Sequence, residues 1–173
     1  STGGFTEVLV KRGIEKVYSV DVGYGQMAWT LRNDPHVVVI DRTNIRDLSI
    51  DQIEDKVDVI VADLSFISLC NVMDSLASVI RDSGEMFLMV KPQFEVGKGQ
   101  LSDGGVVRDP RLRRESVGCV AAAAWDRGFG VLGVVASSLP GPSGNVEYFL
   151  WLRRGAAEID HAMLDEAIAI GPQ

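Results

Sequence analysis

Short apolar segments alternate with helical segments along most of this chain, and this alternation constrains the fold more than any other feature. The clearest apolar segment, VDVIVADL (57–64), is continuous and rich in β-branched residues, which is typical of a strand buried on both faces of a sheet. Strands that alternate with helices favour an open, mostly parallel sheet. The sequence therefore predicts an α/β fold with helices on both faces of the sheet.

The same patterns predict the remaining elements. Helices are expected at 5–12, 25–33, 68–81, 109–128 and 156–169, and strands at 16–22, 36–41, 57–64, 85–91, 130–138 and 145–153. Asp109 is the expected N-cap of the fourth helix, with Pro110 in its first turn. The turn LPGPSG (139–144) joins the last two strands as a hairpin, so one strand runs antiparallel to the others. We expect one domain over 1–155 and a C-terminal helical tail over 156–173.

Composition and charge narrow the classes of function. The chain has 173 residues and a formal net charge of −7, which argues against a broad nucleic-acid surface but permits a local basic patch. Cys70 and Cys119 are far apart in the sequence and indicate buried free thiols in a reducing, cytoplasmic setting. His36 and His161 have no metal-ligand spacing, so no metal site is expected. No apolar run approaches the roughly 20 residues that span a bilayer.

Three charged residues stand at the ends of predicted strands. Asp63 ends one apolar strand, Lys91 ends the next, and Glu147 follows the Gly-rich turn into the antiparallel strand. Ligands in open α/β sheets bind at the carboxyl ends of the strands. A structural ion pair would account for any one of these residues alone, whereas three at one edge indicate a functional site.

A dinucleotide-binding site is an alternative reading of another segment. Gly23, Gly25 and Ala28 form G-x-G-x-x-A after a predicted strand, and Asp41 ends the next strand. This pattern would make the protein an NAD(P)-dependent oxidoreductase. Against it, Asp21 stands ahead of the glycines, where its carboxylate would face a pyrophosphate, and the helix that follows is short.

Seven segments in this order resemble the methyltransferase domain of the TlyA proteins, which are also called hemolysin A. They are STGGFTEVL, VYSVDVGYGQMAWTLRND, RTNIRDL, ADLSFISL, VKPQFEVGKG, GGVVRDP and GPSGNVEYF. This family is part of the FtsJ-like group of S-adenosylmethionine-dependent ribose 2′-O-methyltransferases that act on ribosomal RNA. The resemblance extends to about Arg153 and implies a Rossmann-like class I methyltransferase fold, S-adenosylmethionine as cofactor, and ribosomal RNA or a ribosomal subunit as partner.

The resemblance also implies which residues bind the cofactor. STGGF would be the second half of a glycine loop that cradles the methionine part. Asp21 would accept hydrogen bonds from the two ribose hydroxyls, and Asn44 would contact the adenine. The implied set is Ser1, Thr2, Gly3, Gly4, Phe5, Asp21, Val22, Asn44, Ile45, Asp63 and Leu64.

The catalytic residues follow from the same resemblance. FtsJ-like enzymes use a Lys-Asp-Lys-Glu tetrad, and Asp63, Lys91 and Glu147 match its last three members. Lys91 would either orient the attacking hydroxyl or take its proton, and the sequence leaves both roles open. Enzymes that methylate base amino groups usually carry an Asn/Asp-Pro-Pro-aromatic motif, whereas DLSF (63–66) lacks the prolines and favours a hydroxyl acceptor.

Contacts with RNA are expected beyond the tetrad. A long polar loop follows Lys91 to about residue 108, and its Lys98 and Arg108 would contact phosphates. Arg111, Arg113 and Arg114 have either the same role or that of a solvated helix face. Phe66 and Phe94 would stack on a base or pack in the core.

The opening STGGF has the form of a loop that follows a strand, yet no strand precedes it in this sequence. We expect that central strand to lie between 16–20 and 57–64 in the sheet, with the first tetrad lysine also upstream. Without the first half of the cofactor loop and that lysine, these 173 residues alone are expected to be inactive. The family also carries an N-terminal S4-like RNA-binding domain. The name hemolysin suggests a membrane-active protein as a further alternative, but the acidic tail helix does not support binding to an anionic membrane surface.

Overall fold

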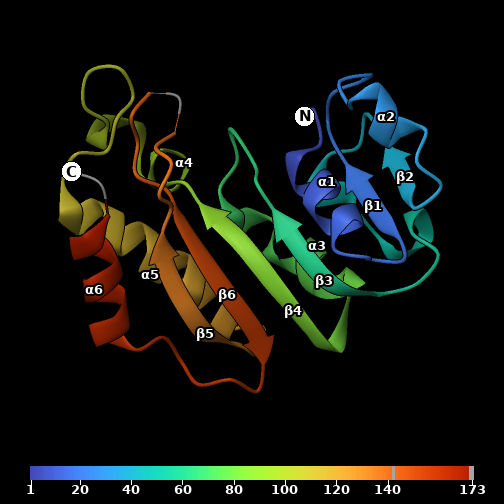
Figure 1. Cartoon of the computed structure of the whole chain (residues 1–173). Helices are drawn as coiled ribbons and strands as arrows, with labels where there is room; N and C mark the ends of the chain where they lie inside the picture. Colours follow the sequence, from blue (N-terminus) through green and yellow to red (C-terminus); the bar gives the residue numbers. More distant parts are fainter. Residues whose placement is uncertain (142, 172–173) are drawn as a thin grey trace. The chain divides into compact units, whose positions relative to one another are not determined.

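The computed structural model describes residues 1–141 and 143–171, with Lys98 described by its backbone alone. The chain divides into two compact units, Ser1–Lys56 and Val57–Gln173 (Figure 1). Each unit has its own sheet, and each is described separately below.

The first unit contains two parallel strands and short helices. Its elements are α1 (Gly4–Lys11), β1 (Val17–Val20), α2 (Trp29–Arg32), β2 (Val37–Ile40), η1 (Ile45–Asp47) and η2 (Ile50–Gln52). β1 pairs with β2 from Val17 opposite Val37 to Val20 opposite Ile40. Both predicted strands are confirmed in shortened form, so that Asp21 lies just beyond its strand. The helix predicted over 25–33 begins only at Trp29, and residues 21–28 form a loop instead.

The second unit contains a four-stranded sheet with the order β3-β4-β6-β5. Its elements are β3 (Val57–Ala62), η3 (Leu69–Asn71), α3 (Met73–Val79), β4 (Ile80–Val90), α4 (Pro92–Glu95), η4 (Lys98–Gln100), α5 (Pro110–Trp125), β5 (Phe129–Ala136), β6 (Tyr148–Arg154) and α6 (His161–Ile170). β3 runs parallel to β4, and β6 runs antiparallel to both β4 and β5. This arrangement confirms the predicted hairpin and the single antiparallel strand.

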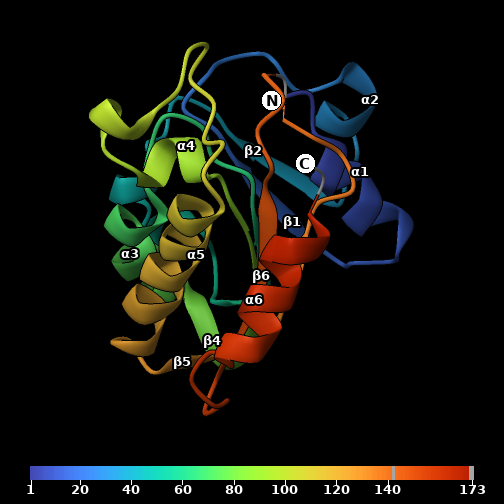
Figure 2. The same ribbon diagram turned by 90° about the vertical axis from the view of Figure 1, so that its left-hand side faces the viewer.

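The core of the second unit lies on one face of its sheet. Met86 pairs with Leu152 and Leu88 with Leu150, and these four side chains have no exposed surface. Helix α5 contributes its buried residues, among them Val120, to the same core. Helices α3 and α5 lie on the same side of the sheet (Figure 2). Because paired residues of neighbouring strands point to the same face, alternate residues of β4 and β6 face the other way.

The helix predicted over 68–81 is wrong at its end. α3 ends at Val79, and Ile80 already pairs with Val57 as the first residue of β4. The register between β3 and β4 then shifts, and Arg81 forms an ion pair with Asp58 at 2.8 Å. Long-range pairing with β3 thus overrides the local helical pattern. The strand predicted at 145–153 likewise starts three residues too early, since β6 begins at Tyr148.

The prediction that the segment 57–64 is buried on both faces is also wrong. Among the described residues, β3 pairs with β4 alone, and its Val59 is 37% exposed.

Helix α5 begins as predicted. Asp109 accepts a hydrogen bond from the backbone N–H of Arg111 at 2.9 Å, and Pro110 is the first helical residue. The tail helix α6 packs against α5 and β5 through its buried residues, including Leu164. None of the helices within the described residues is long and apolar enough to cross a membrane.

The two cysteines differ from the prediction in one respect. Both are free thiols, but Cys119 on α5 is exposed, and Cys70 on η3 is only partly buried. Their sulfur atoms are 3.4 Å apart although 49 residues separate them. Burial is the main cause that raises the pKa of Cys70, to about 12.

Candidate active site

An ion pair lies at the carboxyl edge of the four-stranded sheet. Asp63 directly follows β3 and Lys91 directly follows β4, so both side chains project from the same edge. Lys91 Nζ is 2.6 Å from Asp63 Oδ1 and 3.4 Å from the hydroxyl of Ser65. The Lys91 side chain is 12% exposed and the Asp63 side chain 42%, so the ion pair is only partly shielded from water.

Glu147 lies next to this ion pair in the sheet. The last pair between β4 and β6 is Val90 with Tyr148, so Lys91 and Glu147 are the next residues along the two strands and lie opposite one another. Glu147 is 6% exposed and accepts a hydrogen bond from Gln93 Nε2 at 3.1 Å. The structure therefore brings the three predicted tetrad members to one edge of one sheet.

The loop after Asp63 presents an aromatic side chain to solvent. Phe66 has a φ of 64°, which is rare for a bulky residue, and it is 91% exposed. Its ring lies 5.2 Å from the ring of Phe94, centroid to centroid. The far end of the loop is held by Glu95, which accepts hydrogen bonds from the Ser68 hydroxyl and the Leu69 backbone N–H at 2.5 and 2.8 Å. Burial is the main cause that raises the pKa of Glu95.

The predicted RNA-facing loop is held by the turn that precedes β6. Asn145 is buried, accepts a hydrogen bond from the Val107 backbone N–H at 2.9 Å, and donates to the Gly105 carbonyl at 3.1 Å. Arg108 follows directly and is exposed. Lys98 belongs to η4, and its side chain lies outside the described part of the structure.

The nearby arginines on α5 are engaged within the protein. Arg113 is 4% exposed and donates to the Arg108 carbonyl at 3.2 Å, so a role at the RNA surface is wrong for this residue. Arg111 pairs with Asp109 at 2.9 Å. Arg114 pairs with Asp165 of α6 at 2.5 Å.

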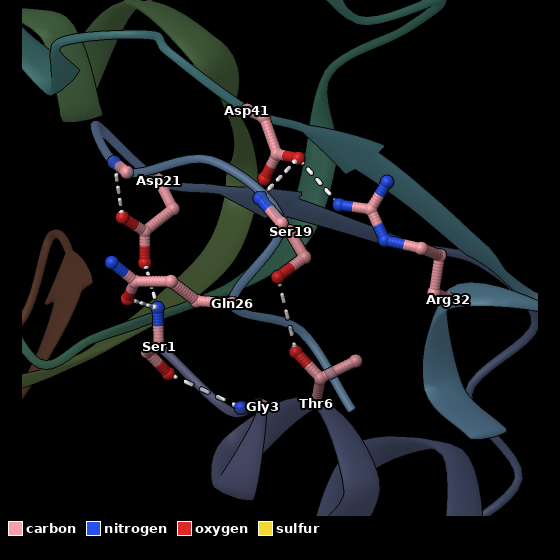
Figure 3. A network of polar contacts seen from close by, with 10 residues as sticks. Ser1, Gly3, Thr6, Ser19, Asp21, Gln26, Arg32 and Asp41 are labelled. Carbon is pink, nitrogen blue, oxygen red and sulfur yellow. Dashed lines mark hydrogen bonds and ion pairs between the residues drawn. The ribbon is translucent and has the colours of Figure 1, made fainter. Parts of the chain in front are cut away.

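A second group of predicted residues meets in the first unit, at the carboxyl ends of β1 and β2. Figure 3 shows Ser1 close to Asp21, and the Ser1 hydroxyl accepts a hydrogen bond from the Gly3 backbone N–H at 3.2 Å. The Asp21 carboxylate accepts from the Gly23 N–H at 2.7 Å.

The loop at the start of α1 is close to this carboxylate network. Gly3 has a φ of 100°, and a Cβ there would lie 2.5 Å from the Met27 sulfur, so the position requires glycine. The Thr2 carbonyl accepts from the Ala28 N–H at 3.1 Å. Gly4 and Phe5 begin the helix, and the described contacts include no side-chain cap for it. Its first N–H groups therefore face outward from the helix end.

Asn44 and its neighbours complete the predicted cofactor set of this unit. Asn44 is exposed, follows β2 and accepts from the Arg46 N–H at 3.0 Å, which leaves its side-chain amide N–H₂ as a donor. Ile45 begins η1, and Val22 is 72% exposed. The two remaining predicted residues, Asp63 and Leu64, belong to the second unit.

The same region argues against a dinucleotide site. Asp41 accepts hydrogen bonds from the Gly25 N–H at 3.1 Å and from Arg32 at 2.5 Å, and these two donors lower its pKa. The Asp21 carboxylate likewise accepts a hydrogen bond from the Gly23 N–H. The glycine N–H groups that would bind a pyrophosphate thus already bind carboxylates, and no helix opens at these glycines.

The amino-acid sequence matches a known family model over residues 1–154, that of the FtsJ-like methyltransferases. The 16S/23S rRNA (cytidine-2′-O)-methyltransferase TlyA of Mycobacterium tuberculosis is 60% identical to the chain over 153 residues, which are 88% of this chain and 57% of the relative. The chain belongs to the FtsJ-like methyltransferase family. It spans about half the length of the curated relatives that it matches.

Solved structures agree with the family. A crystal structure from Lactococcus lactis, named as a hemolysin, has a TM-score of 0.91 and 35% identity over 98% of this chain and 82% of its own. The N-methyltransferase NodS from Bradyrhizobium japonicum, in complex with S-adenosyl-L-homocysteine, has a TM-score of 0.62 at 14% identity and covers 90% of this chain and 74% of its own. The second likeness shows the fold alone, which is that of the class I methyltransferases.

Sequence reasoning missed several residues that organise this FtsJ-like site. Ser65, Gln93, Glu95 and Asn145 contact or orient the residues that were predicted. All four lie inside the segments that carry the family resemblance. Their location in these segments was the sequence signal that could have identified them. Their partners are 26 to 54 residues away in the chain, and no local pattern identifies them.

Proposed function

We propose that this chain is the catalytic part of an S-adenosylmethionine-dependent enzyme that methylates a ribose 2′-hydroxyl of ribosomal RNA in the cytoplasm. The observation that carries the proposal is the Lys91–Asp63 ion pair beside the buried Glu147. By the family resemblance these residues would be three members of the FtsJ-like tetrad, and they lie within the residues that match the family model.

The residues at this edge suit attack by a hydroxyl. Asp63 Oδ1 is 2.6 Å from Lys91 Nζ and fixes the position of the lysine side chain. A charged Lys91 would donate to the substrate oxygen, orient it and stabilise the negative charge that develops as its proton leaves. We therefore assign the orienting role to Lys91, and Glu147 is the nearby acceptor for a substrate hydrogen.

The first unit has groups that fit the cofactor. Asp21, whose side chain is 30% exposed, is an acceptor for the two ribose hydroxyls, and Asn44 offers a donor and an acceptor to the adenine. The outward N–H groups at the start of α1 and the close approach allowed by Gly3 suit the methionine part. When bound, S-adenosylmethionine would supply a methyl group already activated on a sulfonium. The protein would then act mainly by positioning the two reactants.

RNA binding would use the surface around Phe66. An aromatic ring that is 91% exposed and held in a strained backbone conformation is suited to stacking on an unpaired base. Arg108, which is exposed, would bind a phosphate, and Lys98 stays a prediction from the sequence of the same loop. We further propose that an S4-like RNA-binding domain in the whole protein supplies additional affinity for the ribosomal subunit.

Methyl transfer to isolated ribosomal subunits tests the proposal directly. The whole protein that contains these residues is incubated with S-adenosylmethionine labelled in its methyl group, and the RNA is then digested to nucleosides. We expect the label in a 2′-O-methylated nucleoside, and calorimetry should detect binding of S-adenosylmethionine but not of NAD. Label in a base methyl group, or binding of NAD alone, would overturn the proposal.

A further inference from the structure

The short helix α4 places a glutamine directly beside a buried carboxylate. Gln93, two residues after Lys91, donates from Nε2 to Glu147 Oε1 at 3.1 Å. Glu147 is 6% exposed, and within residues 1–141 and 143–171 no other side chain donates a hydrogen bond to it. Its orientation therefore depends on Gln93.

The two ends of the Gln93 side-chain amide differ in their hydrogen bonding. An ionised carboxylate only accepts hydrogen bonds, so the NH₂ end of the amide must face Glu147. The opposite atom, Gln93 Oε1, is buried and has no hydrogen-bond partner among the described residues. An unpaired buried acceptor is costly to the fold. Stability therefore does not account for a glutamine here, whereas the contact of its Nε2 with Glu147 does.

The turn that precedes β6 approaches the same carboxylate oxygen. A Cβ at Gly141 would lie 2.7 Å from Glu147 Oε1, so the backbone of the turn comes close to the carboxylate. Gly141 also donates to the Asn145 carbonyl at 2.9 Å, which closes the turn. The Gln93 amide and the Gly141 backbone thus both lie next to Glu147 Oε1.

We propose that Gln93 is a positioning residue for methyl transfer, which holds the Glu147 carboxylate in the orientation that faces the substrate. The inference rests on the proposed function. Two residues of α4 make separate contacts at the site. Gln93 donates a hydrogen bond to Glu147, and Glu95 accepts one from the Ser68 hydroxyl in the loop after Asp63. This short helix connects the β4 end to both of its neighbours at the site.

The charged groups around the carboxylate define a test by pH. Lys91, the residue after β4, forms an ion pair with Asp63, whereas Arg113 of α5 interacts with Tyr148, the residue after Glu147. Gln93→Glu keeps the shape but replaces the NH₂ donor by oxygen. The two carboxyl groups can then bond only by sharing a proton, which they hold more readily as the pH falls.

The experiment measures kcat and KM for labelled methyl transfer to ribosomal subunits between pH 6 and 8.5. For Gln93→Glu we expect kcat to fall about 10²-fold at high pH, as for a misplaced catalytic group, and to recover toward pH 6. KM for S-adenosylmethionine should stay nearly unchanged. Gln93→Leu, which cannot share a proton, should lose kcat at every pH without recovery.

Gln52→Glu is the matched control. Gln52 accepts from the Ser49 N–H in a capping box at 2.9 Å, and glutamate preserves that contact while adding the same charge. Its pH profile should match that of the unchanged protein. A loss in Gln93→Glu that does not vary with pH, or a Gln93→Leu enzyme of normal kcat, would overturn the inference.

A readout without activity separates this inference from the proposed function. The melting temperature of Gln93→Glu, relative to the unchanged protein, should fall as the pH rises from 5 to 8, because the shared proton is lost. Failure of the unchanged protein to methylate RNA would refute the proposed function and leave this measurement intact. A melting difference that is independent of pH would refute the contact itself.

Discussion

The two units of the chain differ in how they hold their predicted site residues. In the second unit, Leu88 and Leu150 pair across the sheet with no exposed surface, and the site lies at the ends of these same strands. In the first unit, the buried apolar residues Val17 and Leu31 keep 8% exposure, and the carboxylates of Asp21 and Asp41 hold the loops by hydrogen bonds. Core packing thus positions Lys91, whereas local polar contacts position Asp21.

This difference matches the division of labour that we propose. A group that must meet a reacting atom needs a rigid support, because a displacement of about 1 Å can cost about 10²-fold in rate. A group that binds a cofactor by hydrogen bonds tolerates a loop. The following experiments test whether the two units differ as the structure indicates.

The largest effect should come from Lys91→Ala in the whole protein. We expect methyl transfer to fall about 10²–10⁴-fold, the usual range for a lost proton-transfer or orienting group. Cofactor affinity measured by calorimetry should be nearly unchanged.

Asp21→Ala in the whole protein should instead weaken cofactor binding about 10–100-fold, because it removes hydrogen bonds between the cofactor and a charged group.

Lys11→Ala is the control for both variants, since Lys11 is an exposed residue of α1 that pairs only with Glu7, at 2.6 Å, among the described residues. It should alter neither measurement. Equal loss of cofactor affinity in Lys91→Ala and Asp21→Ala would show that the division between the units is wrong.

Stability should respond differently in the two cores. Leu150→Ala removes a fully buried side chain between β4 and β5 and should cost about 2–5 kcal/mol of unfolding free energy. Leu31→Ala, in the four-residue helix α2, should cost less because its surroundings can relax. Hydrogen exchange should locate the loss in β4–β6 for the first variant and in β1–β2 for the second. Equal costs would refute the contrast between the cores.

Phe66→Ala should act on RNA alone. Base stacking on an aromatic ring is worth about 1–3 kcal/mol, so KM for ribosomal subunits should rise while cofactor binding stays constant. Trp29→Ala in the first unit removes another exposed aromatic residue, 77% exposed, and should leave KM unchanged. A similar effect of the two variants would indicate general surface contacts in place of a specific platform.

The smallest effect concerns pH and has opposite signs in the two units. Burial raises the pKa of Glu95 above 4.5, so its contribution to stability is present below about pH 4.5 and is lost as the pH rises through the folded value. The pKa of Asp41 is lowered below 3.8, so its contribution is present at higher pH and is lost as the pH falls. Melting temperatures between pH 3 and 7 should therefore show Glu95→Gln gaining stability, relative to the unchanged protein, toward pH 7. The melting temperature of Asp41→Asn, relative to the unchanged protein, should fall toward pH 7. If both variants changed in the same direction with pH, these pKa directions would be wrong.

Much of this fold follows from local patterns in the sequence. The alternation of apolar runs and helical segments predicted all six strands and the antiparallel hairpin, and Asp109 with Pro110 predicted the start of α5. Strand ends also identified Asp63, Lys91 and Glu147 as one group, because the ends of adjacent strands share an edge. Such predictions succeed because periodicity and capping depend on residues within a few positions of one another.

Only the tertiary structure decided which groups touch. Ile80 joins β4 because it pairs with Val57, and Cys119 is exposed because α5 turns that face outward. Gln93 meets Glu147 across 54 residues, a contact that the sheet register creates. Helical and strand patterns are local properties of the chain, whereas burial and hydrogen-bond partners depend on how distant segments pack.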